Sequence, residues 1–195
     1  GVKASKSGRA TIEDVCAMAE GRNEIDKDLA DLNGNTNAFR LSEGLAFVEA
    51  MNQTFSQQII YGDTSSNPDG VLGLAPRYNL LSAVSGANII DAGGTGSDNT
   101  SVWLIVGGEN TVAGIYPKGS QAGLMQQDLG EIDAFDENND RFRAYAELWK
   151  WKFGLHVKDW RYAVRIANID VSDMVGQSGT QAITAATWLN KLMIK

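Results

Sequence analysis

The most regular apolar pattern in the chain lies between residues 37 and 61. Large apolar side chains recur there at steps of three, four or seven: Leu41, Leu45, Val48, Phe55 and Ile59. This is the period of a helix with one apolar face. At about 1.5 Å per residue, twenty such residues form a rod of roughly 30 Å, the width of a small domain. The pattern therefore predicts a central helix over residues 37–61, ended by a left-handed cap at Gly62.

The segments on either side of this helix carry weaker patterns. Residues 1–20 hold too few apolar side chains for an independent element and are predicted to be extended. Residues 22–32 place apolar side chains at helical spacing, which predicts a short amphipathic helix. Residues 63–101 are rich in Gly, Ser, Asn and Asp, and are predicted to be loops with one short helix near 78–84.

Strand patterns appear in the second half of the chain. Residues 102–106 and 111–116 flank the turn sequence Gly107-Gly108-Glu109-Asn110, which predicts a hairpin. No regular element is predicted for residues 121–132. Alternating large and polar side chains over residues 141–169 predict two long antiparallel strands with a bend near 153–160. A last helix is predicted to begin near residue 180.

Composition and charge narrow the class of protein. The 195 residues are 43% apolar and 21% charged, which is ordinary for a globular domain. A net charge of −7 argues against a sequence-independent nucleic-acid-binding surface, which needs clustered Lys and Arg, although it permits a container for nucleic acid. The one cysteine, Cys16, allows no intrachain disulfide. No apolar run of eighteen residues exists, so no membrane span is predicted.

The strongest metal-like motif is an acidic turn. Asp136, Asn138 and Asp140 occupy the first, third and fifth positions of a calcium loop, and Glu147 occupies the twelfth. Arg141, however, stands where that loop needs glycine, and the following residues alternate as a strand does. We therefore interpret residues 136–140 as a hairpin turn and predict no calcium binding.

Catalytic and cofactor motifs are lacking. His156 is the only histidine, and no serine or cysteine lies in a nucleophile motif, so we predict neither an enzyme nor a cofactor. Exposed tryptophans would favour an alternative function, a β-rich carbohydrate-binding or adhesion module, because aromatic faces stack on sugar rings. Large aromatic residues at alternating strand positions are more often core or interface residues. The five are Trp103, Trp149, Trp151, Trp160 and Trp188.

Several collinear segments resemble the major capsid proteins of tailed bacteriophages, which have the HK97-like fold. The resemblance covers nearly the whole chain. The segments are Phe39-Arg40-Leu41-Ser42-Glu43, Ile60-Tyr61-Gly62-Asp63, Gly73-Leu74-Ala75-Pro76-Arg77-Tyr78-Asn79, Asp91-Ala92-Gly93-Gly94-Thr95-Gly96-Ser97-Asp98-Asn99-Thr100, Ile115-Tyr116-Pro117-Lys118-Gly119-Ser120, Asp159-Trp160-Arg161-Tyr162 and Arg165-Ile166-Ala167-Asn168-Ile169-Asp170.

This resemblance implies an α+β fold with a long spine helix, antiparallel strands and an extended N-terminal loop. The long strands follow soon after the helix, so the order of elements differs from that of the better-known members. The implied domains are an extended-loop segment (1–21), a peripheral-type domain (22–170) and the start of an axial-type domain (171–195). The resemblance also leads us to expect a fragment that lacks an N-terminal arm and a C-terminal part.

The function implied by the resemblance is structural. Copies of the chain are expected to form pentamers and hexamers in an icosahedral shell, which encloses double-stranded DNA without sequence-specific binding. The protein would be part of the virion and would assemble in the host cytoplasm. In the basic N-terminal segment, Lys3, Lys6 and Arg9 are the candidate contacts with a neighbouring subunit.

Overall fold

The computed structural model of the chain describes residues 11–32, 34–172, 187 and 190. It is a mixed helix and sheet structure, as predicted. The elements, with η for short 3-10 helices, are β1 (Cys16–Asp26), α1 (Lys27–Asp31), α2 (Thr36–Tyr61), α3 (Leu74–Arg77), η1 (Val84–Asn88), β2 (Ile89–Asp91), β3 (Asn99–Ile105), β4 (Val112–Ile115), β5 (Gly123–Phe135), β6 (Arg141–Val157), η2 (Trp160–Tyr162) and β7 (Ala163–Asp170).

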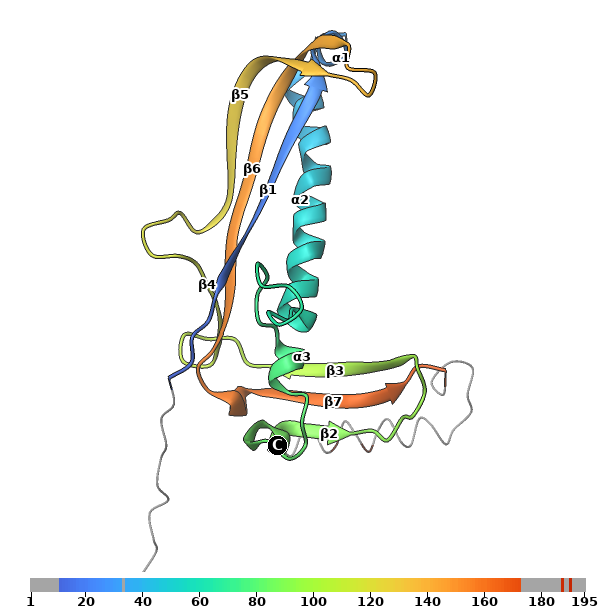
Figure 1. Ribbon diagram of the computed structural model, residues 1–195, viewed down its shortest axis with the longest axis vertical. Helices are drawn as coiled ribbons and strands as arrows, with labels where there is room; N and C mark the ends of the chain where they lie inside the picture. The colour runs from blue at the N-terminus through green and yellow to red at the C-terminus, as the bar shows by residue number, and fades with distance from the viewer. Residues whose placement is uncertain (1–10, 33, 173–186, 188–189, 191–195) are drawn as a thin grey trace, which may run out of the picture.

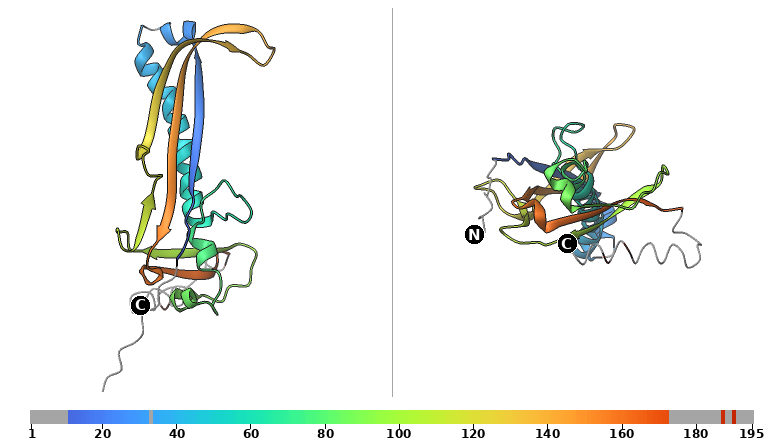
Figure 2. Two further views of the ribbon diagram at one scale, coloured as in Figure 1. Left: turned by 60° about the vertical axis from the view of Figure 1, so that its left-hand side comes forward. Right: turned by 90° about the horizontal axis from the view of Figure 1, so that it is seen from below.

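Two sheets and one long helix make up the body. In the long sheet, β6 is central, with β1 antiparallel on one side and β5 followed by β4 antiparallel on the other. In the small sheet, β7 is central, with β2 parallel on one side and β3 antiparallel on the other. Helix α2 lies beside the long sheet, and the small sheet runs across the lower end of both (Figure 1). The second orientation in Figure 2 shows the same elongated body.

The prediction of a long helix is confirmed, because α2 spans Thr36–Tyr61. Its buried residues are Gly44, Met51 and Phe55. Part of the predicted apolar face is wrong, since Leu41 and Leu45 are 54% and 57% exposed. The upper half of α2 meets the sheet through Gly44 instead, where an added Cβ would lie 2.8 Å from Cζ2 of Trp149. This close approach leaves the two leucines outside the contact.

The face of the long sheet that meets α2 joins large side chains on β6 to small ones on β1. Directly opposite pairs on this face are Gly21 with Trp149, Ala19 with Trp151 and Ala17 with Phe153. The ring of Phe55 packs between two of these aromatic rings, with centroids 5.0 Å from Trp151 and 5.2 Å from Phe153. Because the β1 side chains are small, the helix fits closely against the aromatic row of β6.

Three predicted segments before and after α2 need correction. Residues 16–26 form β1, so the predicted extended segment 1–20 ends in a strand and the predicted helix 22–32 begins only at Lys27. The short helix expected near 78–84 is α3, four residues earlier, followed by η1. Gly62 is not a left-handed cap, since its φ is −56°. Glycine is required at this position for a steric reason, because an added Cβ would lie 2.2 Å from the Val71 carbonyl oxygen.

The predicted strand pairings also differ from those observed. The hairpin of residues 102–106 with 111–116 is wrong, because β3 pairs with β7 and β4 pairs with β6. The two strands predicted over residues 141–169 exist as β6 and β7, but they belong to different sheets. Strand β5 occupies residues for which no element was predicted. The helix predicted from residue 180 lies outside the described residues.

We expect Phe55→Ala to lower the free energy of unfolding by about 3–5 kcal/mol, because the ring is 5% exposed and fills the space between helix and sheet. Leu45→Ala, on the same helix but 57% exposed, should change it by no more than about 0.5 kcal/mol. Urea unfolding of both variants measures the difference. Equal effects would show that α2 does not pack on the sheet through Phe55.

Candidate intersubunit surfaces

Two charge clusters, each with a buried carboxylate, join separate elements of the body, and the first involves Arg40 on α2. Its Nη2 donates to Asp128 on β5 at 2.8 Å and to Glu147 on β6 at 2.9 Å. The guanidinium also lies 5.0 Å from the ring centroid of Tyr145. The Glu147 side chain is only 5% exposed, whereas that of Asp128 is 59% exposed. Arg40 therefore fixes the first half of the helix to two strands at once.

The second cluster holds the start of β1 against the body. The Asp14 carboxylate accepts a hydrogen bond from Arg77 Nη2 at the end of α3 and lies 2.9 Å from Nδ1 of His156 on β6. Burial raises the pKa of Asp14, but the hydrogen bonds with Arg77 and His156 outweigh it, and the pKa is lowered overall. Ile12 and Val15 beside it are more than half exposed. Asp14 is therefore the anchor of this segment.

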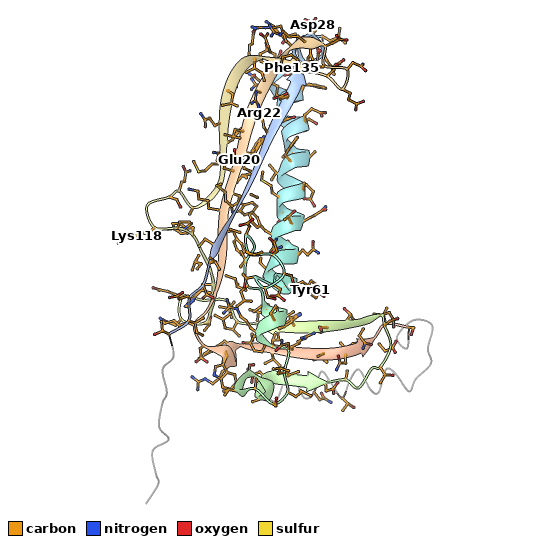
Figure 3. The ribbon with its side chains drawn as sticks, in the orientation of Figure 1. Glu20, Arg22, Asp28, Tyr61, Lys118 and Phe135 are labelled. Atoms are coloured by element: carbon orange, nitrogen blue, oxygen red, sulfur yellow. The ribbon has the colours of Figure 1, made fainter. Side chains whose placement is uncertain are left out.

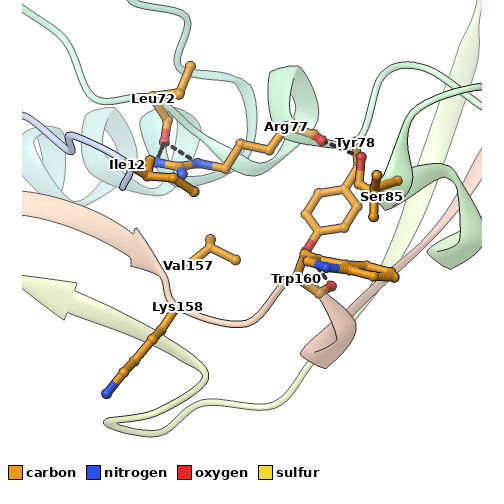
Figure 4. A pocket seen from close by; sticks show the side chains of 9 residues that line it. Ile12, Leu72, Arg77, Tyr78, Ser85, Val157, Lys158 and Trp160 are labelled. Carbon is orange, nitrogen blue, oxygen red and sulfur yellow. Dashed lines mark hydrogen bonds between the residues drawn. The ribbon is translucent and has the colours of Figure 1, made fainter. Parts of the chain in front are cut away.

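An apolar groove of about 420 Å³ opens near the lower end of β6 (Figure 4). Its walls are mainly Ile12, Leu72, Tyr78, Val84, Val157 and Trp160. The Tyr78 hydroxyl donates to the Trp160 carbonyl oxygen at 2.7 Å, and burial raises the pKa of Tyr78 to about 12. The Tyr78 hydroxyl therefore stays neutral near pH 7, and the charged side chains of Arg77 and Lys158 also line the groove. The groove can accommodate apolar side chains.

Large apolar side chains are exposed near both ends of the body. Figure 3 shows Phe135 and Asp28 at the upper end and Tyr61 at the lower end of α2. Exposed residues of the upper elements include Leu29, Leu32, Leu41, Leu45 and Phe135, and those near α3 include Leu80, Leu81 and Val84. Apolar surface of this extent is typical of contacts with other protein chains.

The outer face of the long sheet carries several charged side chains. Side chains there alternate with those facing α2, and they include Glu20 and Arg22, both labelled in Figure 3. Lys150 on β6 binds Glu20 at 3.0 Å, and Arg22 binds Glu24 at 2.9 Å. Exposed pairs of this kind contribute little stability. They keep this face hydrated in the lone chain.

The residues predicted as sites fall in different places. Lys3, Lys6 and Arg9 lie outside the described residues. The acidic turn is a hairpin turn between β5 and β6, in which Asp136 Oδ1 accepts from the N–H groups of Asn138 and Asp140 at 2.9 and 2.8 Å. Glu147 lies well along β6 and binds Arg40, so it is not placed to complete a calcium loop. Within the described ranges, no three His, Cys, Asp or Glu side chains gather as metal ligands.

The four tryptophans in the described part of the chain do not form an exposed platform. Trp149 is buried, and Trp103, Trp151 and Trp160 are half-buried. Trp188 lies outside the described residues. His156, interpreted from the sequence as an outward polar strand residue, contacts Asp14. None of the helices in the described part is long and apolar enough to cross a bilayer.

One signal in the sequence points to the charge clusters. Glu147 interrupts the aromatic alternation between Tyr145 and Trp149, and a carboxylate on an apolar strand face requires a buried cationic partner. The sequence alone does not identify Arg40 as that partner, because the contact joins segments that are far apart along the chain. The same holds for Asp14, Arg77 and His156, which come from three separate elements.

Comparison with known structures defines the fold. The chain is similar to one in the cryo-EM structure of the holo-SrpI encapsulin complex from Synechococcus elongatus PCC 7942, with 13% identity and a TM-score of 0.54 over 85% of this chain and 77% of that one. At that identity the likeness concerns the fold alone, the HK97-like fold of shell proteins. The search among curated proteins gave no match.

Sequence similarity shows the protein family to which the chain belongs. A chain in the cryo-EM structure of bacteriophage Epsilon15 is 39% identical, with a TM-score of 0.61 over 92% of this chain and 55% of that one. The family model for major capsid protein GP7 matches residues 1–195. The chain therefore belongs to the major capsid protein GP7 family, and the resemblance predicted from its sequence is confirmed. It spans about half the length of the Epsilon15 chain.

We expect Asp14→Asn to destabilise the fold in a pH-dependent way. Because the folded pKa of Asp14 is below its ordinary value, its stabilising effect is present above the unfolded pKa of about 3.9 and is lost as pH falls through the folded pKa. The variant should therefore lose about 1.5–3 kcal/mol near neutral pH, and less in acid. Urea unfolding at several pH values measures this.

Glu13→Gln is the matched control, because Glu13 is the exposed neighbour in the same segment. It should unfold like the wild type across the range. A deficit of Asp14→Asn that stays constant from neutral pH down to strong acid would contradict an ionised Asp14 as the anchor.

Proposed function

We propose that this protein is the structural subunit of a phage head. Copies of it self-assemble into an icosahedral shell that encloses double-stranded phage DNA. The observation that carries the proposal is the match of the major capsid protein GP7 family over residues 1–195. The exposed apolar side chains at both ends of the body support it, since a subunit must keep such surface available for its neighbours.

The proposed shell contains pentamers and hexamers of one chain. Such rings reuse the same surfaces at slightly different angles. A stiff body suits this use, and α2 with the long sheet supplies it over the 26 residues of the helix. In our proposal the protein assembles in the host cytoplasm and remains in the virion. Residues 22–170 serve as the peripheral-type domain, and residues 171–195 begin the axial-type domain.

In this proposal the shell encloses DNA without binding it sequence-specifically. The net charge of −7 supports this, because sequence-independent binding to DNA requires clustered basic side chains. We assign no catalytic role, which agrees with a structural family. The alternative, a carbohydrate-binding module, is less well supported, because all four described tryptophans are buried or half-buried.

Electron microscopy of the purified full-length protein tests the proposal directly. We expect shells or capsomer rings under conditions that favour assembly. A protein that stays monomeric at all concentrations and salt conditions tested would contradict the proposed function.

We also propose that the basic N-terminal segment packs on a neighbouring subunit. Lys3, Lys6 and Arg9 make residues 1–10 locally basic in an acidic chain, so the surface of another copy is a favourable partner. Strand β1 begins later in the sequence, at Cys16. Residues 1–10 can therefore be altered without removing Asp14 or any residue of β1.

We expect the triple substitution Lys3→Glu, Lys6→Glu and Arg9→Glu to weaken shell formation, because the attraction between copies becomes repulsion. Raised salt should diminish the difference from the wild type by screening. Light scattering during assembly measures it, and circular dichroism checks that the body stays folded. The triple alanine variant is the control, with an intermediate defect. If both variants assemble like the wild type, Lys3, Lys6 and Arg9 do not contribute to the contact between subunits.

A further inference from the structure

Strand β5 forms one edge of the long sheet in the described part of the chain. Strand β5 pairs with β6 on one side, and no described strand pairs with its other side. Figures 1 and 2 both show it at the border of the long sheet. Of its 13 residues, only Ala134 is buried. Such an edge presents unpaired N–H and C=O groups to which another chain can add a strand.

The two halves of this edge differ in how they are protected. The upper half carries Glu131 and Asp133, which form ion pairs across the sheet. A bulge between Asp128 and Gly130 separates it from the lower half, and Gly130 has a φ of 74°. Charges and bulges are the devices by which proteins prevent edge pairing. Residues 123–127 have neither of these, nor a proline.

We propose that the lower half of β5 pairs antiparallel with the same segment of a second copy, across a two-fold axis. A second copy is the occupant that the charges favour. Each chain carries a net −7, so two copies approach most easily where no like charges face each other. Residues 123–127 form such a charge-free stretch, Gly-Leu-Met-Gln-Gln. The inference rests on the proposed function, since it names one contact between shell subunits.

Symmetry restricts the register of this pairing. A two-fold axis perpendicular to the sheet keeps each side chain on its own face, so the axis must pass through a residue and not between two. An axis at Gln126 would place Leu124 against Asp128 of the other copy, and Asp128 is bonded to Arg40. An axis at Met125 pairs residues 123–127 with themselves and leaves Asp128 outside. We therefore assign the axis to Met125.

Met125 is suited to that position. It lies on the outer face, directly opposite Lys150 of β6, and is 36% exposed. Across the axis, the two methionine side chains would contact each other and bury apolar surface. The contact is small, as suits a shell in which every copy is held by several contacts at once.

Cysteine crosslinking tests the register in the full-length protein. In a Cys16→Ser background, Met125→Cys should form a disulfide-linked dimer on mild oxidation, seen on a non-reducing gel. Directly opposite residues have Cα atoms about 4.5–5.5 Å apart, which is within the range a disulfide spans. Met18→Cys is the matched control, because Met18 is also an exposed methionine on the outer face but lies on β1. It should stay monomeric on the gel.

Charge substitution tests the same contact by another route. Met125→Glu alone should reduce assembly, because two like charges meet at the axis, and mixing it with Met125→Lys should restore assembly. Met18→Glu should assemble like the wild type. A merely structural role for Met125 would not produce rescue by mixing.

The outcomes separate this inference from the proposed function. Shells without the Met125→Cys dimer overturn the β5 pairing and leave the capsid function in place. A disulfide dimer from Met125→Cys, without one from Met18→Cys, supports the pairing even where shells are absent. Equal crosslinking of both variants, or failure of the mixed pair to restore assembly, also overturns it.

Discussion

The packing of α2 against the aromatic row of β6 is the constraint on which the rest of the structure depends. The rings of Trp149, Trp151 and Phe153 have space because β1 places only Gly21, Ala19 and Ala17 opposite them. An added Cβ on Gly44 would lie 2.8 Å from the Trp149 ring, and one on Gly21 would lie 3.2 Å from Phe47. Small residues on the helix and on the edge strand therefore determine how closely three elements approach, and burial of the rings provides the stabilisation.

A buried charge pair in the same interface restricts the position of the helix. Arg40 and Glu147 are 11% and 5% exposed, so their attraction is offset by the cost of desolvation. Sliding α2 by a turn would leave both charges buried and apart, which costs about 3–5 kcal/mol. The aromatic contacts therefore supply stability, and the charge pair excludes alternative alignments. The fixed alignment of α2 with the long sheet comes from the two together.

The structural features that were predicted correctly are those that depend on a pattern within one segment of the sequence. Helix α2 was found because its period is contained in one segment, and β6 because large side chains alternate along it. Strand β5 was missed because only Ala134 is buried, so its pattern carries no apolar signal. The predicted hairpin of residues 102–106 with 111–116 does not form. A turn sequence at Gly107-Gly108 does not decide strand pairing when β6 and β7 offer longer partners. The two charge clusters join distant segments, which no local pattern reveals.

The same distinction explains why the functional surfaces are hard to read from sequence. Leu41 and Leu45 have the spacing of core residues, yet they are exposed, because Gly44 takes the contact with the sheet. In the proposed shell, contact with a neighbouring copy would cover such residues, so they would satisfy the apolar pattern between chains. The pattern of the sequence then describes the assembly as well as the single fold. In that case, burial of these side chains by other copies would also favour the folded chain by mass action.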